Sequence, residues 1–170
     1  MRNLAQIQLP ERVEVFSAKV LVISDSAFSG DREDLSGPKI TKYLESNDFF
    51  VVDLKVIKDG IDSVANALIA MSEQFAGLIV TTGGTGFSQR DLTPEGTLKV
   101  IQRHAPGLAE KMRQSSPLGP LSRGIAGCIG SALIVNVPGS QKGAIESIEA
   151  IIGILPHALS LLVDPGDAHP

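Results

Sequence analysis

Cysteine and large aromatic residues are scarce in this sequence. Its 170 residues include one cysteine, Cys128, one tyrosine and no tryptophan. A single cysteine excludes an internal disulfide, which fits a reducing compartment. The three histidines share no metal-ligand spacing and none accompanies Cys128, so no zinc site is expected. We therefore expect a cytoplasmic protein whose one thiol is packed in the structure.

Positive charge and long apolar runs are also lacking. Lys and Arg number 15 against 19 Asp and Glu, a net charge of −4, and no basic run occurs. Nucleic acid is therefore not expected as a partner. No apolar stretch approaches the roughly 18 residues that span a bilayer, and residues 1–10 lack the apolar core of a signal peptide. With 43% hydrophobic residues, the chain is instead expected to form an ordered globular core without a membrane partner.

Short β-branched runs alternate with helical patterns along most of the chain. Strands are predicted at 18–24, 50–57, 78–82 and 132–137, with lengths typical of strands buried on both faces. Residues 122–129 suit an extra strand, for which an antiparallel direction is one of the two alternatives. This alternation predicts an α/β fold with a mostly parallel sheet and helices on its faces. We expect an N-terminal arm at 1–16, a single domain at 17–163 and a disordered tail at 164–170.

The helical segments carry recognisable start and stop signals. Thr93 and Pro94 are typical of an N-cap and a first helical position. Pro156 interrupts the apolar spacing of the last segment and should split that helix. In the helix that follows the second strand, one apolar face is expected from Ile61, Val64, Ala65, Leu68, Ile69 and Phe75. Further helices are predicted at 38–47, 93–101, from 106 onward, and at 145–162.

The loops after the four strands carry the polar residues that suit a ligand site. In open α/β sheets, ligands bind beyond the carboxyl ends of the strands. The glycines of the third loop permit close backbone approach and an anion-binding nest, although a plain strand-to-helix turn is the alternative. This loop lacks the lysine of a P-loop, and neither a GxGxxG fingerprint nor a Gly-x-Ser-x-Gly elbow occurs. The loops contain Ser24 and Asp25, then Asp59, then Gly83, Gly84, Thr85, Gly86 and Asp91, and finally Pro138, Gly139 and Ser140.

Each charged candidate also has a plainer reading. Asp91 suits Mg²⁺ opposite a phosphate, or an acid at a helix start. Asp59 has the same two readings, and Asp25 belongs either to a site or to a solvated acidic loop. Ser122 and Arg123 offer a hydroxyl and a phosphate-binding guanidinium, or an ordinary surface pair.

Taken in order, these segments resemble the MogA/MoaB molybdopterin adenylyltransferase family over about residues 18–163. The motifs are SDS and EDLSGP near the first strand, TTGGTGF with RDLTPE, LSR, and NVPGS. The chain is also similar to the G domains of gephyrin and of the plant molybdenum-cofactor protein. The resemblance implies a three-layer α/β/α sandwich with a Rossmann-like sheet, usually a homotrimer. It also implies transfer of AMP from Mg-ATP to the terminal phosphate of molybdopterin, with hand-over to a molybdenum insertion protein. A non-catalytic trimeric MoaB-type paralogue that binds molybdopterin is the alternative.

The resemblance assigns roles to individual residues. Asp59 and Asp91 match two critical aspartates, which share pterin positioning and Mg²⁺ or nucleotide geometry, with Asp91 as the metal residue. Ser122 matches a serine near the molybdopterin. The cradle for phosphate would be Gly83, Gly84, Thr85 and Gly86, and the nucleotide side would be shaped by Ser24, Asp25, Pro138, Gly139 and Ser140.

Three features depart from the family pattern. Ile129 stands where relatives often have a basic residue, which predicts one missing positive charge for an anionic substrate. The segment 112–121 is shorter than in gephyrin and is expected to shape a different pocket edge. The arm at 1–16 has no assigned purpose.

Overall fold

Residues 15–163 are described by this computed structural model, and six strands form one sheet in the order β2-β1-β3-β6-β5-β4. The neighbouring pairs among β2, β1, β3 and β6 are parallel, whereas β5 runs antiparallel to β6 and to β4. The mostly parallel sheet and the antiparallel extra strand are therefore confirmed. The strands are β1 (Phe16–Ile23), β2 (Phe49–Ile57), β3 (Gly77–Thr82), β4 (Arg103–His104), β5 (Ala126–Ile129) and β6 (Ala132–Val137).

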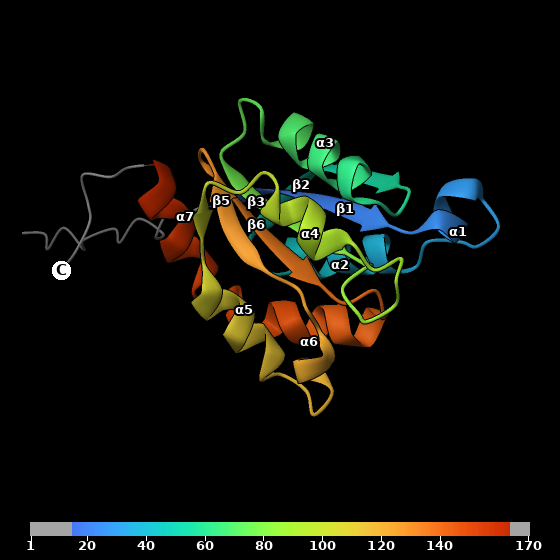
Figure 1. Cartoon of the computed structure of the whole chain (residues 1–170). Helices are drawn as coiled ribbons and strands as arrows, with labels where there is room; N and C mark the ends of the chain where they lie inside the picture. Colours follow the sequence, from blue (N-terminus) through green and yellow to red (C-terminus); the bar gives the residue numbers. More distant parts are fainter. Residues whose placement is uncertain (1–14, 164–170) are drawn as a thin grey trace, which may run out of the picture.

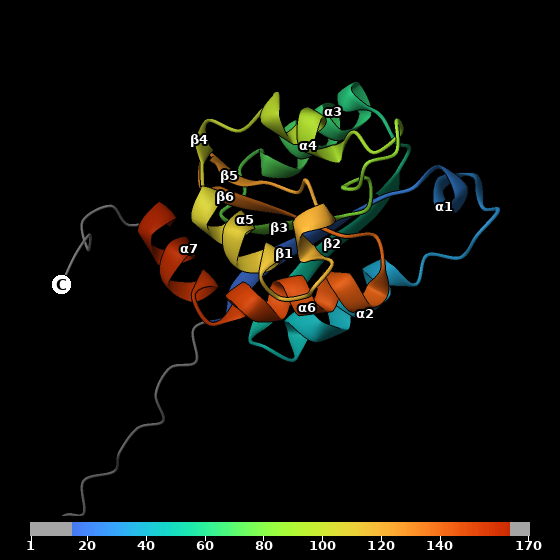
Figure 2. The ribbon, with the colours of Figure 1, turned by 60° about the horizontal axis from the view of Figure 1, so that its bottom comes forward.

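Helices cover both faces of this sheet, as Figures 1 and 2 show. One face packs against α2, α5, α6 and α7 around a large apolar cluster that includes Ile40, Met112, Ile148 and Leu159. The other face packs against α3 through a smaller cluster that includes Leu68. The three-layer α/β/α sandwich is thus confirmed. The helices are α1 (Asp25–Ser29), α2 (Ser36–Glu45), α3 (Ile61–Ser72), α4 (Thr93–Leu98), α5 (Pro106–Arg113), α6 (Gln141–Ile152) and α7 (Leu155–Val163), with a 3₁₀ turn, η1 (Gly119–Leu121).

One strand differs from its predicted environment. β2 is an edge strand, and Phe50, Val52 and Leu54 are exposed. The prediction that it is buried on both faces was wrong, because an apolar run alone does not distinguish a central strand from an edge strand. A β-bulge opposite Ala18 and Lys19 also shifts its register along β1.

Two helical predictions also require correction. Ile69 was expected on the buried face of α3 but is 46% exposed, while Met71 is buried in its place. The N-cap of α4 is Leu92 rather than Thr93, because the Thr93 hydroxyl donates instead to the Gly83 carbonyl at 2.8 Å. Sequence spacing missed the short elements α1 and β4.

The last two helices separate at the predicted place. Pro156 lies in the first turn of α7, after a break at residues 153–154. Within the described residues, no single helix has both the length and the apolar composition to cross a membrane. Helices α6 and α7 are long and apolar enough only when taken together, and the chain bends by 65° between them. The proposed arm and tail lie mainly outside the described residues and stay predictions.

The strand order places a switch point at the centre of the sheet. The chain moves from β1 outward to β2, and then from β3 in the opposite direction to β6. Loops that leave neighbouring strands in opposite directions open a crevice beyond the carboxyl ends of those strands. The loops after β1 and β3, which carry most candidate residues, are the two that flank this crevice.

Candidate active site

The glycine-rich loop after β3 passes very close to its neighbours. Gly83 has φ +100° and Gly84 has φ +63°, values that L-residues with side chains rarely adopt. A Cβ atom on Gly83 would lie 2.2 Å from the Ile23 carbonyl oxygen, and one on Gly84 would lie 2.4 Å from the Thr93 hydroxyl. Glycine is therefore required at both positions by backbone conformation and by space.

Hydrogen bonds hold this loop against α4 and the loop after β6. The Thr93 backbone N–H donates to the Gly84 carbonyl at 3.1 Å. The Thr82 hydroxyl donates to the Pro138 carbonyl at 2.8 Å, which ties the ends of β3 and β6 together. A Cβ on Gly139 would lie 3.2 Å from Gly83 Cα, so the two loops are in contact. The predicted convergence of these loops is therefore present.

Two cavities open on either side of this contact. One, of about 510 Å³, is lined by Thr85, Gly86, Ser122, the loop 112–121 and the start of α6. The other, of about 600 Å³, is lined by Ser24, Asp59, Gly83 and the segment 32–36. We call them the Ser122 cavity and the Asp59 cavity. Both are lined by Gly84, Asp91, Gly139 and Ser140.

Asp25 and Asp59 form a reciprocal clamp between the loops after β1 and β2. The Asp25 backbone N–H donates to Asp59 Oδ2 at 3.0 Å, and the Asp59 N–H donates to Asp25 Oδ1 at 3.1 Å. The N-cap of α3 is Gly60, so the reading of Asp59 as a helix cap is wrong. Burial raises the pKa of Asp59, and the nearby Asp25 and Asp91 carboxylates raise it further, against the Asp25 N–H and Arg90, which lower it.

Asp91 closes the loop that begins at Gly86. Its Oδ2 accepts the Ser88 backbone N–H at 2.9 Å, and its own N–H donates to the Ser88 carbonyl at 2.9 Å. A Cβ on Gly86 would lie 2.9 Å from Asp91 Oδ2. The carboxylate thus lies against the glycine loop, at the junction of the two cavities, rather than capping α4.

The Arg123 guanidinium, for which phosphate binding and an ordinary surface position were the two alternatives, binds other parts of the protein instead. Its Nε–H donates to the Gly86 carbonyl at 2.7 Å, and its terminal nitrogens bind the Asp91 carbonyl and the Glu95 carboxylate. The hydrogen bond from Arg123 lowers the pKa of Glu95. All of these partners are carbonyl or carboxylate groups of residues 86–95. The Arg123 side chain is therefore bound within the protein rather than available to a phosphate ligand.

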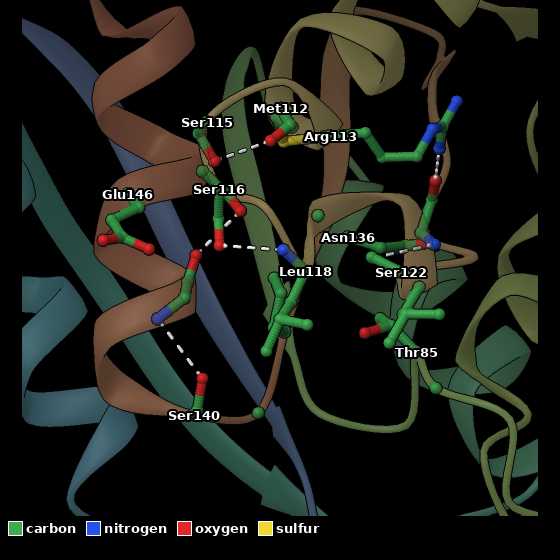
Figure 3. Close-up of a pocket in the computed structure, with 18 of the residues that line it drawn as sticks. Thr85, Met112, Arg113, Ser115, Ser116, Leu118, Ser122, Asn136, Ser140 and Glu146 are labelled. Carbon is green, nitrogen blue, oxygen red and sulfur yellow. Dashed lines mark hydrogen bonds between the residues drawn. The ribbon is translucent and has the colours of Figure 1, made fainter.

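Ser122 lies in the wall of the cavity shown in Figure 3, together with Thr85 and Asn136. Its Oγ accepts the Gly124 N–H at 3.2 Å. The opposite wall includes Ser140, which caps α6 by accepting the Gly143 N–H at 3.2 Å. Ser24 caps α1 in the same way through the Ala27 N–H at 3.3 Å. Both capping serines thus lie at the cavities where the sequence placed them.

The departure at Ile129 does not touch this site. Ile129 pairs with Ala132 at the beginning of β6 and packs against the smaller apolar cluster. Because β5 is antiparallel, its last residue lies at the end of the sheet opposite to the candidate loops. The expectation that this position removes a charge from the site was therefore wrong. The neighbouring thiol of Cys128 is half-buried, and burial raises its pKa, which makes it a poor nucleophile.

The loop before Ser122 supplies the residues that sequence reasoning missed. This loop lines the Ser122 cavity, and the expectation that its edge differs from that of gephyrin stays a prediction. No motif in the sequence pointed to its individual residues. The start of α6 adds one cation and one acid that are four residues apart, with Lys142 Nζ 3.7 Å from Glu146 Oε1. The residues of the Ser122 cavity that were not foreseen include Met112, Arg113, Ser115, Ser116, Leu118, Lys142 and Glu146.

The donor set suits a magnesium ion that is held mainly by its nucleotide. Within residues 15–163, no group of three Asp, Glu, His or Cys side chains forms a ready-made metal site. Asp59 and Asp91 each have one oxygen bound to a backbone N–H, and their Oδ1 atoms take no donor from the described residues. Mg²⁺ typically uses one or two carboxylates together with phosphate oxygens and waters. These residues therefore fit Mg²⁺ bound together with a phosphate ligand.

Comparison with known proteins agrees with the sequence motifs. Residues 19–157 match the family model described as a probable molybdopterin binding domain. A molybdopterin adenylyltransferase of Helicobacter pylori (strain J99) is 39% identical over 153 residues, covering 85% of this chain and 86% of the relative. The Escherichia coli (strain K12) molybdopterin adenylyltransferase is 36% identical over 136 residues, covering 76% of this chain and 70% of the relative. The crystal structure of a molybdopterin biosynthesis enzyme, MoaB of Thermus thermophilus, superimposes with a TM-score of 0.81 at 42% identity, covering 87% of this chain and 96% of that one. The chain therefore belongs to the family of probable molybdopterin binding domains, and its resemblance to the MogA and MoaB proteins is confirmed.

Proposed function

We propose that this protein is a molybdopterin adenylyltransferase, which transfers AMP from Mg-ATP to the terminal phosphate of molybdopterin and releases pyrophosphate. The observation that carries the proposal is the pair of cavities that share Gly84, Asp91, Gly139 and Ser140. A reaction between two phosphorylated substrates needs two adjoining binding sites with one meeting point. Relatives named molybdopterin adenylyltransferase supply the substrates' identity.

The two cavities take different substrates in this proposal. ATP occupies the Asp59 cavity, where Ser24, Gly139 and Ser140 form part of the wall. Asp25 lies outside this lining and acts on it through its clamp with Asp59, whereas Pro138 lines the Ser122 cavity. Molybdopterin occupies the Ser122 cavity, whose wall includes the cations Arg113 and Lys142. Lys142 also lies 3.7 Å from Glu146, and Arg113 donates to the Gly124 carbonyl at 2.9 Å. The glycine loop then lies where the two phosphate groups meet, and its backbone N–H groups are suited to bind them.

The reaction needs positioning more than acid–base chemistry. An oxygen of the molybdopterin phosphate forms a bond to the α-phosphorus of ATP, while the bond from that phosphorus to the β-phosphate oxygen breaks and pyrophosphate leaves. The attacking phosphate is already an anion, so no side chain must remove a proton. Catalysis therefore depends on alignment and on neutralising charge between two anions.

Asp91 and Asp59 are the residues that would hold the magnesium ion with the nucleotide. When bound, Mg²⁺ supplies positive charge to the phosphate oxygens. Asp91 lies at the junction of both cavities and Asp59 lines one of them. The Asp25–Asp59 clamp keeps the loops after β1 and β2 at a fixed distance.

The proposed activity is tested by anaerobic incubation of the full chain with molybdopterin and Mg-ATP. Mass spectrometry should detect adenylyl-molybdopterin, and a coupled assay should detect an equal amount of pyrophosphate. Tight molybdopterin binding without product would contradict the enzyme assignment and support the non-catalytic paralogue. If product forms, its chemistry assigns the next step to a protein that inserts molybdenum, which is the downstream partner we propose.

We also propose that the protein assembles as a homotrimer. The edge strand β2 exposes Phe50, Val52 and Leu54, and an unpaired apolar edge favours association with another chain. Light scattering at micromolar concentration should give a mass three times 17.9 kDa. A mass near 17.9 kDa would contradict the proposal.

A further inference from the structure

Arg123 joins two parts of the candidate site that lie far apart in the sequence. Its backbone N–H donates to the Thr85 carbonyl at 2.8 Å, and its Nε–H donates to the Gly86 carbonyl at 2.7 Å. Its terminal nitrogens bind the Asp91 carbonyl and both oxygens of Glu95. One residue thus holds both ends of the 86–91 loop and the first turn of α4.

The residue before Arg123 lines the same cavity as Asp91 but comes from a distant part of the sequence. Ser122 lines the Ser122 cavity, whereas Asp91 lines both cavities. Arg123 is adjacent to the first in sequence and bonded to the second through its main-chain carbonyl. The Arg123 side chain therefore connects the residue next to Ser122 directly to the main chain of Asp91.

The ion pair with Glu95 fixes the guanidinium in this orientation. The side chains of Arg123 and Glu95 are 31% and 35% exposed, so both are shielded from much of the solvent. Four of the five guanidinium N–H groups have a role in these contacts. The remaining N–H cannot make a two-point contact with a phosphate, which excludes bidentate substrate binding by this arginine.

We propose that Arg123, oriented by Glu95, is a positioning residue that sets the Asp91 carboxylate and the glycine loop relative to Ser122 for the transfer step. It acts through these groups and does not contact the substrates. The proposal rests on the proposed function. It predicts that the planar set of guanidinium N–H donors contributes more to kcat than the positive charge does. Lysine carries the same charge but lacks a fork that reaches three partners.

The kinetic test compares Arg123→Ala, Arg123→Lys and Glu95→Gln in the full chain. We expect kcat to fall about 100-fold in Arg123→Ala, because small misplacements of aligned groups cost about that much. Arg123→Lys should recover less than a tenth of the parent kcat, and Glu95→Gln should lose about 10-fold. The KM for ATP should change by less than about 3-fold, while the Mg²⁺ concentration for half-maximal rate should rise. A rise in KM with unchanged kcat, or full activity in Arg123→Lys, would overturn the proposal.

Chemical rescue tests whether the guanidinium group itself restores turnover when it is no longer attached to the chain. Guanidinium ion at tens of millimolar should restore part of kcat in Arg123→Ala and should not raise the parent rate. The matched control is Lys99→Gln, which breaks an exposed ion pair between α4 and α3, with Lys99 Nζ 2.6 Å from Asp62 Oδ1. This control should keep parent kinetics and show no rescue. Absence of rescue in an Arg123→Ala protein that is folded and binds ATP would count against positioning.

Hydrogen exchange separates this proposal from the proposed activity. Amides in residues 83–91 should exchange at least about 10-fold faster in Arg123→Ala than in the parent, while the amides of β3 and β6 stay protected. This measurement needs no turnover. If the parent makes no product but the loop loses protection, the activity assignment fails and the positioning contact stands. If the parent is active and loop exchange is unchanged in Arg123→Ala, the positioning proposal is wrong.

Discussion

Asp91→Asn is expected to lower kcat for adenylyl transfer by about 10²–10³-fold while the fold stays intact. The asparagine amide oxygen can still accept the Ser88 N–H that Asp91 Oδ2 accepts at 2.9 Å. The loop should therefore keep its conformation. The fall in kcat then reports only the removal of the negative charge at the junction of the two cavities. A loss of this size is typical when one electrostatic contact to a reacting group is removed.

Three measurements define the outcome for Asp91. Product formation should be followed at saturating ATP and molybdopterin, with the Mg²⁺ requirement titrated in parallel. The control is Asp62→Asn, which removes an exposed carboxylate on α3 and should leave kcat unchanged. Thermal unfolding should give the same midpoint for Asp91→Asn as for the parent. Turnover within a few-fold of the parent would show that the Asp91 carboxylate has no part in the reaction.

Asp59→Asn is expected to abolish most turnover and to stabilise the protein at neutral pH. We expect kcat to fall about 100-fold, because the variant loses one of two carboxylates suited to the metal-bound nucleotide. The asparagine oxygen still accepts the Asp25 N–H, so the clamp between the loops can persist. Stability should rise because burial and two nearby carboxylates disfavour the charged form of Asp59 in the folded state. Replacing a functional group that lies in unfavourable surroundings commonly raises the stability of a protein and lowers its activity.

The pH dependence of this effect has a defined sign. The folded-state pKa of Asp59 lies above the ordinary value of 3.8, so the folded state binds a proton more readily than the unfolded state. The parent is therefore penalised at neutral pH and recovers stability as pH falls through the raised pKa. The stability difference between Asp59→Asn and the parent should be largest near pH 7 and shrink toward pH 4.

Thermal unfolding of both proteins at several pH values measures this difference. The acid limb of kcat/KM in the parent should also have a midpoint above 3.8 if charged Asp59 is required. Equal unfolding midpoints at pH 7 would show that Asp59 is not destabilising. A lower unfolding midpoint for Asp59→Asn than for the parent would show that charged Asp59 stabilises the folded state, which contradicts the prediction.

The central strands and the main helices were predictable from local pattern. β6 has the predicted bounds, 132–137, and the runs that form β1 and β3 differ from prediction by one or two residues. β3 and β6 are buried at every position and the second half of β1 is buried, so most of their residues are apolar and each run stands out. The environment of β2 was not predictable, because its apolar residues face an open edge in this chain. The short elements α1 and β4 contain too few residues for a periodic signal.

The positions of the candidate residues were predictable, but their partners were not. Parallel strands bring their following loops to one edge, so Asp59, Asp91 and Ser140 meet there whatever the side-chain details. Arg123 shows the limit of that reasoning. Its neighbour Ser122 faces a cavity, while Arg123 itself binds carbonyls 32 and 37 residues away. A guanidinium in a sequence does not show whether its donors are free.

The sequence by itself determined the sheet, the edge of the sheet that carries the candidate residues, and the family. Those properties depend on apolar periodicity, on glycines required by backbone conformation and on motifs in a fixed order. The tertiary structure alone decided that two cavities share Gly84 and Asp91, that Ile129 lies at the far end of the sheet, and that Arg123 holds the loop. These depend on contacts between residues distant in sequence, which are set only when strand order and loop packing bring carbonyls, carboxylates and donors within hydrogen-bonding distance.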